Sequence, residues 1–294
     1  ADPKLGRAYS GLADTLINDG PLTFADRDSE RTREIRSLTE SALRLEPESA
    51  EAYTTRGALG WVTWRFREAE QDLRTAIRLN PSYAHAHLIL GRVLAADGRT
   101  AEALAELKLA CEFDPLSSRT FDNYAGTLRE AGRYSEALAQ AERAIALQPN
   151  NNQAVRTKMQ ALSHLGRHDE AVALARGQAA FSPTGVPGVT VLVRAGHAQE
   201  ATRLFENLKD ERRGSAMPTQ LAVLGQREEA LQALDAQEAA VITITGLYFN
   251  EAFDPLRNEP RFVRYLTTLG VKEAHARAQS WRAAHPAEKI KPTK

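Results

Sequence analysis

Three glutamates recur at a regular spacing and are the first candidates for acid–base chemistry. Glu102, Glu136 and Glu170 lie 34 residues apart. Paired carboxylates act as general acid and base only when the fold brings them to one site. Residues that recur once per structural unit lie one unit apart in space and do not meet at one site. A carboxylate near a helix start is stabilised by the helix dipole. We therefore predict a structural role for these glutamates and no enzymatic activity.

The histidines and the cysteine show no pattern typical of a metal site or a nucleophile. His85 and His87 would point apart on a helix, and His164 and His168 flank a glycine, so neither pair has metal-binding i,i+4 geometry. The single cysteine, Cys111, cannot form an intrachain disulfide, and we expect a buried structural thiol. The sequence has no phosphate-binding Gly-rich loop, His-Glu-x-x-His motif or nucleophile elbow. We expect no catalytic residue, metal or cofactor.

The composition indicates a soluble chain without a basic surface. Hydrophobic residues make up 43% and charged residues 26% of the 294 residues, and the formal net charge is zero. A net charge of zero argues against direct nucleic-acid binding. The sequence contains no run of 18 apolar residues, so we expect no membrane insertion. The cysteine count leaves cytoplasm and periplasm open, and we favour the cytoplasm.

Proline and glycine divide most of the chain into equal units. The prolines that recur every 34 residues are Pro47, Pro81, Pro115, Pro149 and Pro183. Gly98, Gly132 and Gly166 follow the same period. Proline ends a helix, and glycine allows the sharp turn into an antiparallel helix. One unit is therefore predicted to be helix, tight turn, helix and stop.

These units resemble the tetratricopeptide repeat (TPR). The third unit carries Leu90-Gly91, Gly98-Arg99, Glu102-Ala103, Ala110 and Asp114-Pro115 at the positions typical of that family. The resemblance implies an all-α fold, a right-handed superhelical α-solenoid of helix-turn-helix repeats with a C-terminal helical cap. Arg56 replaces the usual Leu before Gly57, and Lys158-Met159 replaces a Leu-Gly pair, so we expect looser helix packing there.

We predict about seven repeats, a cap and a tail. The repeat boundaries are 4–47, 48–81, 82–115, 116–149, 150–183, 184–213 and 214–240, followed by a capping segment at 241–284 and a flexible tail at 285–294. The first repeat houses an insertion near 18–29. The last two are degenerate with short first helices, and Gly185-Val186-Pro187-Gly188 should delay the start of the sixth.

The segment after the repeats is similar to a closing segment found in bacterial multidomain signalling proteins. It reads Phe253-Asp254-Pro255-Leu256-Arg257, then Glu259-Pro260-Arg261-Phe262. The relatives are TPR regions fused to winged-helix transcription regulators, class III adenylate cyclases or Ser/Thr kinases. The resemblance implies a fragment whose output domain lies upstream. A hydrophobic cap is physically required, because the last repeat otherwise leaves an apolar face bare.

The family resemblance also implies a concave groove lined by the first helices of the repeats. Laid on this chain, the family's ligand-contact positions include Arg92, Arg119, Asn123, Arg129, Arg156 and Gln160. Arginine binds carboxylates with two hydrogen bonds, so an acidic segment or a C-terminal carboxylate is the predicted guest. The family's carboxylate clamp for chaperone C-termini is not matched.

Two functions remain open at this stage. The first is a protein- or peptide-binding scaffold, an interaction or sensory module of a bacterial signalling or transcription-regulatory protein, with self-association as one form of it. The second is a small-molecule-sensing domain that changes curvature to control an attached output domain. For the first, charge reversal at Arg92 and Arg156 together is predicted to abolish partner capture without loss of helicity.

Overall fold

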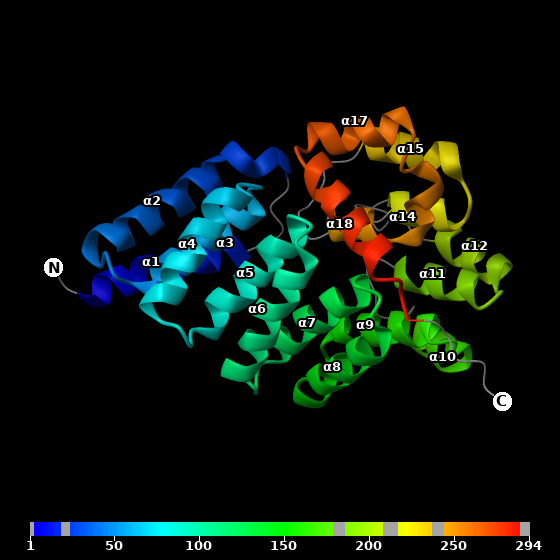
Figure 1. The fold of residues 1–294 in the computed structure, drawn as a ribbon, viewed down its shortest axis with the longest axis horizontal. Helices are drawn as coiled ribbons and strands as arrows, with labels where there is room; N and C mark the ends of the chain where they lie inside the picture. The colour runs from blue at the N-terminus through cyan, green and yellow to red at the C-terminus, as the bar shows by residue number, and fades with distance from the viewer. Residues whose placement is uncertain (1–2, 19–23, 179–185, 208–216, 237–243, 289–294) are drawn as a thin grey trace. The chain divides into compact units, whose positions relative to one another are not determined.

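The computed structural model describes residues 3–18, 24–178, 186–207, 217–236 and 244–288. These residues form helices joined by short turns, and no strand occurs in the described ranges (Figure 1). The chain divides into two compact units. Of the described residues, those from 3 to 115 form the first unit together with Ile244, and those from 116 to 236 and from 245 to 288 form the second.

The first unit is a row of antiparallel helix pairs, drawn from blue to blue-green in Figure 1. Its helices are α1 (Pro3–Asn18), the 3-10 helix η1 (Phe24–Asp28), α2 (Glu30–Leu45), α3 (Ala50–Val62), α4 (Phe66–Leu79), α5 (Ala84–Ala96) and α6 (Thr100–Phe113). The second helices end two residues before Pro47, Pro81 and Pro115, and α3 and α5 begin three residues after the first two of these prolines. Part of the insertion predicted near 18–29 lies outside the described residues.

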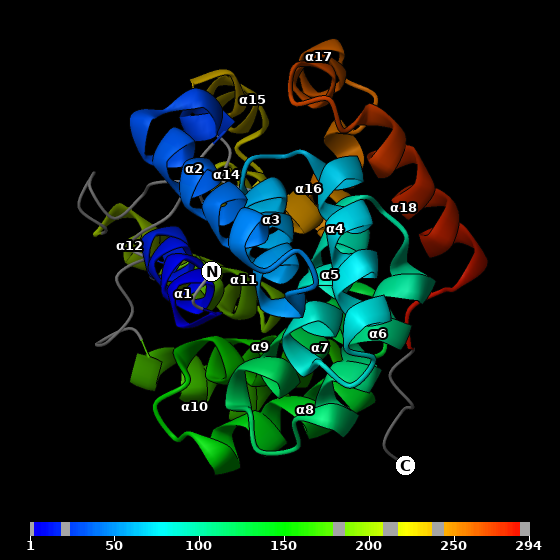
Figure 2. The same cartoon turned by 90° about the vertical axis from the view of Figure 1, so that its left-hand side faces the viewer.

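The second unit continues the helix pairs and adds the C-terminal helices. Its elements are α7 (Ser118–Glu130), α8 (Tyr134–Leu147), α9 (Asn152–His164), α10 (His168–Gln178), α11 (Val186–Arg194), α12 (Ala198–Glu206), α14 (Met217–Val223), α15 (Arg227–Ala236), α16 (Ile244–Phe249), η3 (Glu251–Leu256), α17 (Pro260–Thr268) and α18 (Lys272–Ala284). Figure 2 shows α7 to α10 as neighbouring hairpins.

The turn inside each hairpin depends on a left-handed residue. Gly98, Gly132 and Gly166 have φ values of 74°, 77° and 77°. At the first of them, the Arg99 N–H donates to the Leu94 carbonyl at 2.8 Å, which closes the end of α5. Trp64 holds the same position with φ 64°, the single non-glycine residue with positive φ among the described residues.

The recurring glutamates brace these turns. Glu102, Glu136 and Glu170 each accept a forked pair of hydrogen bonds from an arginine three residues earlier, with N···O distances of 2.6–2.7 Å. Arg99 also donates to Glu70 of the preceding hairpin at 2.7 Å. The carboxylates are engaged one repeat apart, which is the structural role predicted for them.

The sixth repeat starts in the ordinary register, so the predicted delay is wrong. Helix α11 begins at Val186, three residues after Pro183, just as α9 begins three residues after Pro149. Proline is tolerated in the first turn of a helix, where its missing N–H has no acceptor. The helix is short because it ends early: Gly196 follows Gly166 after 30 residues instead of 34.

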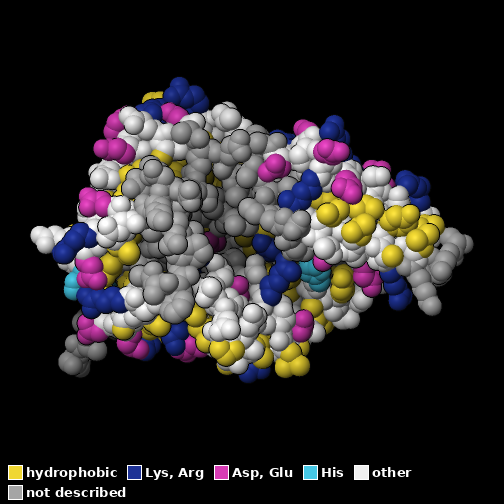
Figure 3. Space-filling model, turned by 180° about the vertical axis from the view of Figure 1, so that it is seen from behind, with side chains coloured by type: hydrophobic (Ala, Val, Ile, Leu, Met, Phe, Trp, Pro, Cys, Tyr) yellow, Lys and Arg dark blue, Asp and Glu magenta, His cyan; other side chains and the backbone are white. Residues whose placement is uncertain are grey.

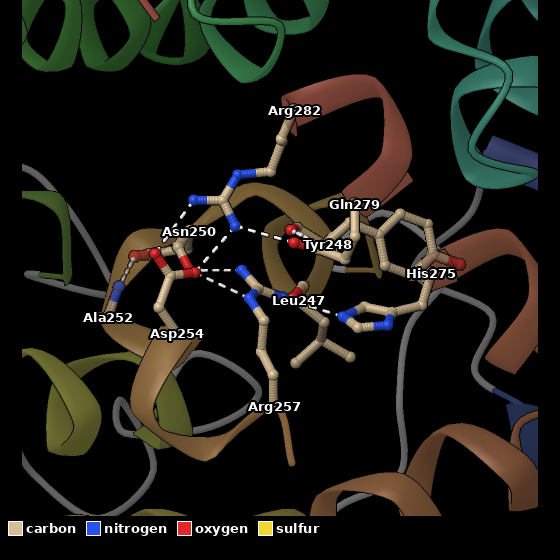
Figure 4. Close-up of polar contacts among 9 residues, drawn as sticks. All are labelled: Leu247, Tyr248, Asn250, Ala252, Asp254, Arg257, His275, Gln279 and Arg282. Atoms are coloured by element: carbon tan, nitrogen blue, oxygen red, sulfur yellow. Dashed lines mark hydrogen bonds and ion pairs between the residues drawn. The ribbon is translucent and has the colours of Figure 1, made fainter. Parts of the chain in front are cut away.

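The C-terminal helices close around an apolar core. Phe253, Leu256, Phe262 and Leu266 are at most 2% exposed. Arg257 fixes this segment from within (Figure 4): it donates to Asp254 at 2.7 Å and to the carbonyls of Leu247 and Asn250 at 2.8 and 3.0 Å. Residues of the closing motif, Arg257 among them, therefore stabilise the fold of the C-terminal segment itself.

Candidate functional site

The second unit contains a cavity of about 400 Å³. One wall comes from α7, α9 and α11, which are first helices of their repeats, and the other comes from η3, α18 and the residues after α18. The charged residues on these walls are Arg129, Glu130, Arg194, Glu251 and Arg282, together with His164 and His285. The inner face of the repeats is therefore covered here by the chain's own C-terminal segment.

The structure brings two of the six predicted groove residues into this cavity, Arg129 and Gln160. Arg119 and Asn123 lie on α7 outside it, where the Asn123 amide donates to the Arg119 carbonyl at 2.8 Å. Arg156 is also outside the lining, and burial together with the nearby Arg129 charge lowers its pKa. These six residues remain predicted peptide contacts.

Arg92 belongs to the first unit and has an aromatic neighbour. Its guanidinium carbon lies 3.7 Å from the centroid of the Trp61 ring, a cation–π contact. The indole is 6% exposed. The contact with the Trp61 ring therefore restricts the direction of the Arg92 side chain on α5.

Each arginine of the cavity has an acidic neighbour. Arg129 contacts Glu130 at 3.1 Å, and Arg194 pairs with Glu251. Arg282 contacts Asp254 at 2.8 Å (Figure 4). Burial raises the pKa of Glu130, against the opposing effects of Arg129 and a hydrogen bond from Thr245. The cavity is thus polar and rich in hydrogen-bond donors.

A stacked aromatic pair completes the wall. The rings of Tyr134 and His164 lie 4.1 Å apart between centroids and are nearly parallel, at 15°. Burial, then the charges of Arg194 and Arg129, lower the pKa of His164 to about 3. The imidazole is therefore neutral at pH 7 and offers no positive charge of its own.

The neutral His164 predicts an acid sensitivity of this unit. Because its folded pKa lies below the ordinary value of about 6.5, the unfolded state binds the extra proton, so stability falls as pH drops from 6.5 towards 3. At pH 5 the loss from this residue is about 2 kcal/mol relative to pH 7. Urea unfolding of wild type and His164→Phe at both pH values measures it: the variant keeps the ring stack and should lose about that much less stability. Equal pH dependence of the two proteins would contradict the assignment.

Residues 285–288 lie against the start of α8. The Glu288 carboxylate accepts hydrogen bonds from the Ser135 N–H at 2.8 Å and from the Ser135 hydroxyl at 2.6 Å. The Glu288 N–H donates to the Gly132 carbonyl at 3.0 Å. A flexible tail from residue 285 is the sequence-based expectation; in the structure its first four residues are docked, and residues 289–294 lie outside the described ranges.

A matched glycine pair tests this docking. A Cβ at Gly132 would lie 2.8 Å from the Ala287 Cα, whereas a Cβ at Gly196 meets nothing within 4 Å, and both residues have positive φ. Each Gly→Ala change should cost about 1–2 kcal/mol from left-handed strain. Hydrogen exchange should then show loss of Glu288 amide protection in Gly132→Ala alone. Equal protection in both variants would refute the contact.

Sequence reasoning missed half of the cavity. Arg194 ends the shortened α11 and Arg282 lies on α18, so the family's groove positions include neither. The signal available in the sequence was the closing motif, which predicts a C-terminal segment folded against the repeats but not which repeats it meets. Within the described ranges, no cluster of three His, Cys, Asp or Glu side chains has metal-binding geometry, and no helix has the length and apolar character to cross a membrane.

Comparison with known proteins identifies the repeats over part of the chain. Residues 65–118 and 126–185 match the tetratricopeptide repeat model. No curated protein matches the chain by sequence. Among solved structures, PilF of Pseudomonas aeruginosa is 17% identical, with a TM-score of 0.58 over 79% of this chain and 97% of PilF.

Two further solved structures agree. PilW, a type IV pilus biogenesis factor, is 19% identical with a TM-score of 0.56 over 76% of this chain and 97% of PilW. The TPR protein TTC0263 of Thermus thermophilus is 19% identical with a TM-score of 0.51 over 67% of this chain and 99% of its own. At these identities the likeness concerns the fold alone. The described residues form an all-α solenoid of the tetratricopeptide-repeat type, as the sequence predicts, and the repeat model itself matches residues 65–118 and 126–185.

Proposed function

We propose that this chain is a non-enzymatic scaffold that binds a protein or peptide, with an acidic segment or a C-terminal carboxylate as the guest. The observation that carries the proposal is the docking of residues 285–288, in which the repeats hold a non-helical segment of their own chain through its one carboxylate, Glu288. Backbone and carboxylate of Glu288 are both recognised, through Gly132 and Ser135. A peptide from a partner offers the same groups.

The charge and burial of the inner helices support the same guest. Arg92 of α5 lies over the ring of Trp61 of α3, and Arg119 of α7 is exposed. Positive and negative side chains are interspersed on the face seen in Figure 3, and the formal net charge of the chain is zero, so a general basic field does not explain capture of an acidic guest. Recognition therefore depends on individual arginines with fixed surroundings.

The proposal is tested on peptide arrays. Ten-residue sequences of acidic, neutral and basic composition, with free or amidated carboxyl ends, are probed with wild type, Arg92→Gln and Arg119→Gln. Exposed outer-helix controls are Arg78→Gln in α4 and Arg203→Gln in α12. We expect selection of acidic sequences and a loss of about 5-fold or more in the first two variants only. Binding without charge preference, or unaffected by both variants, would overturn the proposal.

The choice of variants follows from the structure. Charge reversal at Arg156 places a carboxylate in a site where burial already disfavours charge and Asp122 is a neighbouring acid. Loss of partner capture in that variant would then report on folding as well as binding. Neutral glutamine at Arg92 and Arg119 avoids this, and circular dichroism checks helicity in each case.

We further propose that the scaffold serves a bacterial signalling or transcription-regulatory protein. The support is the resemblance of the closing motif, Phe253 to Phe262, to the TPR regions of such proteins. Self-association is the competing arrangement, in which a second copy supplies the acidic segment. Sedimentation of the wild-type chain over a range of concentrations separates the two: a concentration-dependent dimer favours self-association.

A further inference from the structure

Three arginines from three separate elements converge inside the cavity of the second unit. Arg129 lies in α7, Arg194 at the end of α11 and Arg282 in α18, and all three line the cavity. Burial raises the pKa of the Tyr134 hydroxyl, and the charges of these same three arginines oppose that rise. The guanidinium groups therefore act on one region of the cavity, where Glu130, Glu251 and Asp254 are their acidic neighbours.

The carboxylates of the protein leave donors in this region unused. Arg129 contacts Glu130, yet its Nε is buried without a hydrogen-bond partner in the described structure. The Ser163 hydroxyl on the cavity wall is likewise unpartnered, in a residue 2% exposed. A buried donor without a partner costs free energy unless a ligand or water supplies an acceptor. The pattern points to missing acceptors, not to missing donors.

We propose that this cavity binds a small organic oxyanion, a carboxylate or a phosphate ester, held by Arg129, Arg194 and Arg282. Ser163 and Gln160 supply further polar contacts from α9. The carbon skeleton of the ligand lies against the stacked Tyr134 and His164 rings. The volume of about 400 Å³ falls within the range of small-molecule sites, about 300–1,000 Å³.

The two walls give such a ligand a structural effect. Arg129 and Arg194 belong to repeat helices, whereas Arg282 belongs to the C-terminal segment that covers them. An oxyanion bound to all three ties the segment to the repeats, so the free energy of unfolding of this unit rises with ligand concentration. This function is separate from peptide capture at Arg92 and Arg119, and the two can fail independently.

The test uses the full chain with inorganic phosphate and citrate as probes, each up to about 20 mM, a range suited to weak binding. Calorimetric titration and thermal unfolding are recorded at constant ionic strength set with NaCl. The variants are Arg194→Gln, Arg282→Gln and Ser163→Ala. Arg176→Gln is the matched control, because Arg176 also pairs with a glutamate, Glu200 at 2.9 Å, but outside the cavity.

We expect saturable binding at one site, an increase in Tm above that in NaCl, and about 10-fold weaker affinity in either arginine variant. Ser163→Ala should weaken binding without loss of fold, because its hydroxyl has no partner to lose. Preference for phosphate or for citrate identifies the kind of oxyanion. Absence of saturable binding for both probes overturns the proposal, and so does unchanged affinity in both Arg194→Gln and Arg282→Gln.

Discussion

Replacing Arg257 by methionine should destabilise the C-terminal segment and lower the free energy of unfolding by about 3–5 kcal/mol. Its side chain is 11% exposed. Methionine fills much of the volume but removes the Arg257 donor to the Leu247 carbonyl and leaves the Asn250 carbonyl with the Phe253 N–H at 3.2 Å. It also removes the donor that faces His275 Nε2 at 2.9 Å (Figure 4). Burial and the charges of Arg257 and Arg282 lower the pKa of His275 to about 4, which leaves the ring neutral and able to accept.

The control is Arg261→Met in the same sequence motif. Arg261 pairs with Glu228 and Asp235, whose side chains are 63% and 43% exposed. Water readily replaces such partners, so the effect should be much smaller. Urea unfolding followed by circular dichroism gives the total cost, and hydrogen exchange over residues 244–284 shows where it falls. Similar losses in both variants would mean that Arg257 is not the centre of the segment.

The second large effect concerns the contact between α5 and α6. Leu107 is fully buried, and truncation to alanine should cost about 2–5 kcal/mol. A Cβ added at Gly91 would lie 2.6 Å from the Leu107 Cγ and 3.2 Å from the Ala103 carbonyl oxygen. Gly91→Ala should therefore cost about 1–3 kcal/mol by overpacking, despite the better helix propensity of alanine.

The double variant Gly91→Ala, Leu107→Ala measures whether the two residues are in contact, through the non-additivity of their effects on the free energy of unfolding. Because the new methyl group then occupies volume that Leu107 has left, the combined loss should be smaller than the sum by about 0.5–3 kcal/mol. Gly126→Ala is the control for propensity alone, since nothing lies within 4 Å of its Cβ, and it should gain about 1 kcal/mol. Additive losses in the urea-derived free energies would contradict the contact.

The same space explains why the departures from the repeat pattern do not disturb the core. Gly57 and Gly91 face Leu73 and Leu107, and each added Cβ would lie 2.6 Å from a leucine Cγ. One repeat further on, alanine holds both equivalent positions, and in the fifth repeat Met159 is matched by Ala175. Met159 is 2% exposed. The larger residue on one helix is compensated by a smaller one on its partner.

The two charged departures are compensated in a similar way. Arg56 of α3 pairs with Asp72 of α4 at 2.6 Å, and Lys158 of α9 pairs with Glu142 of α8 at 2.8 Å. When one repeat position is compared with the family pattern, such a residue looks like a packing defect. The residue that compensates it lies 16 positions away, on the neighbouring helix. The sequence predicts looser packing at these sites, but in the structure both charged residues are paired and Met159 is buried.

The fold can be predicted from the sequence because the interactions that define each hairpin are local in the chain. Proline stops, left-handed glycines and the Arg-x-x-Glu brace each act within one hairpin, so their period is visible in the chain. The cavity depends on contacts of long sequence separation, such as Ser135 with Glu288. No repeat period encodes where the C-terminal segment meets α7, α9 and α11. Arg129 and Gln160 are reached by the family register, whereas Arg194 and Arg282 are not.

The central claim is that the inner helices of the repeats recognise an acidic segment. Hydrogen exchange of the intact chain, with and without the peptide selected on the arrays, tests this directly. The account predicts slower exchange in α5 and α7, which carry Arg92 and Arg119, and unchanged exchange in the outer helices α4, α6 and α12. Protection confined to the outer helices, or no protection at saturating peptide, would contradict it.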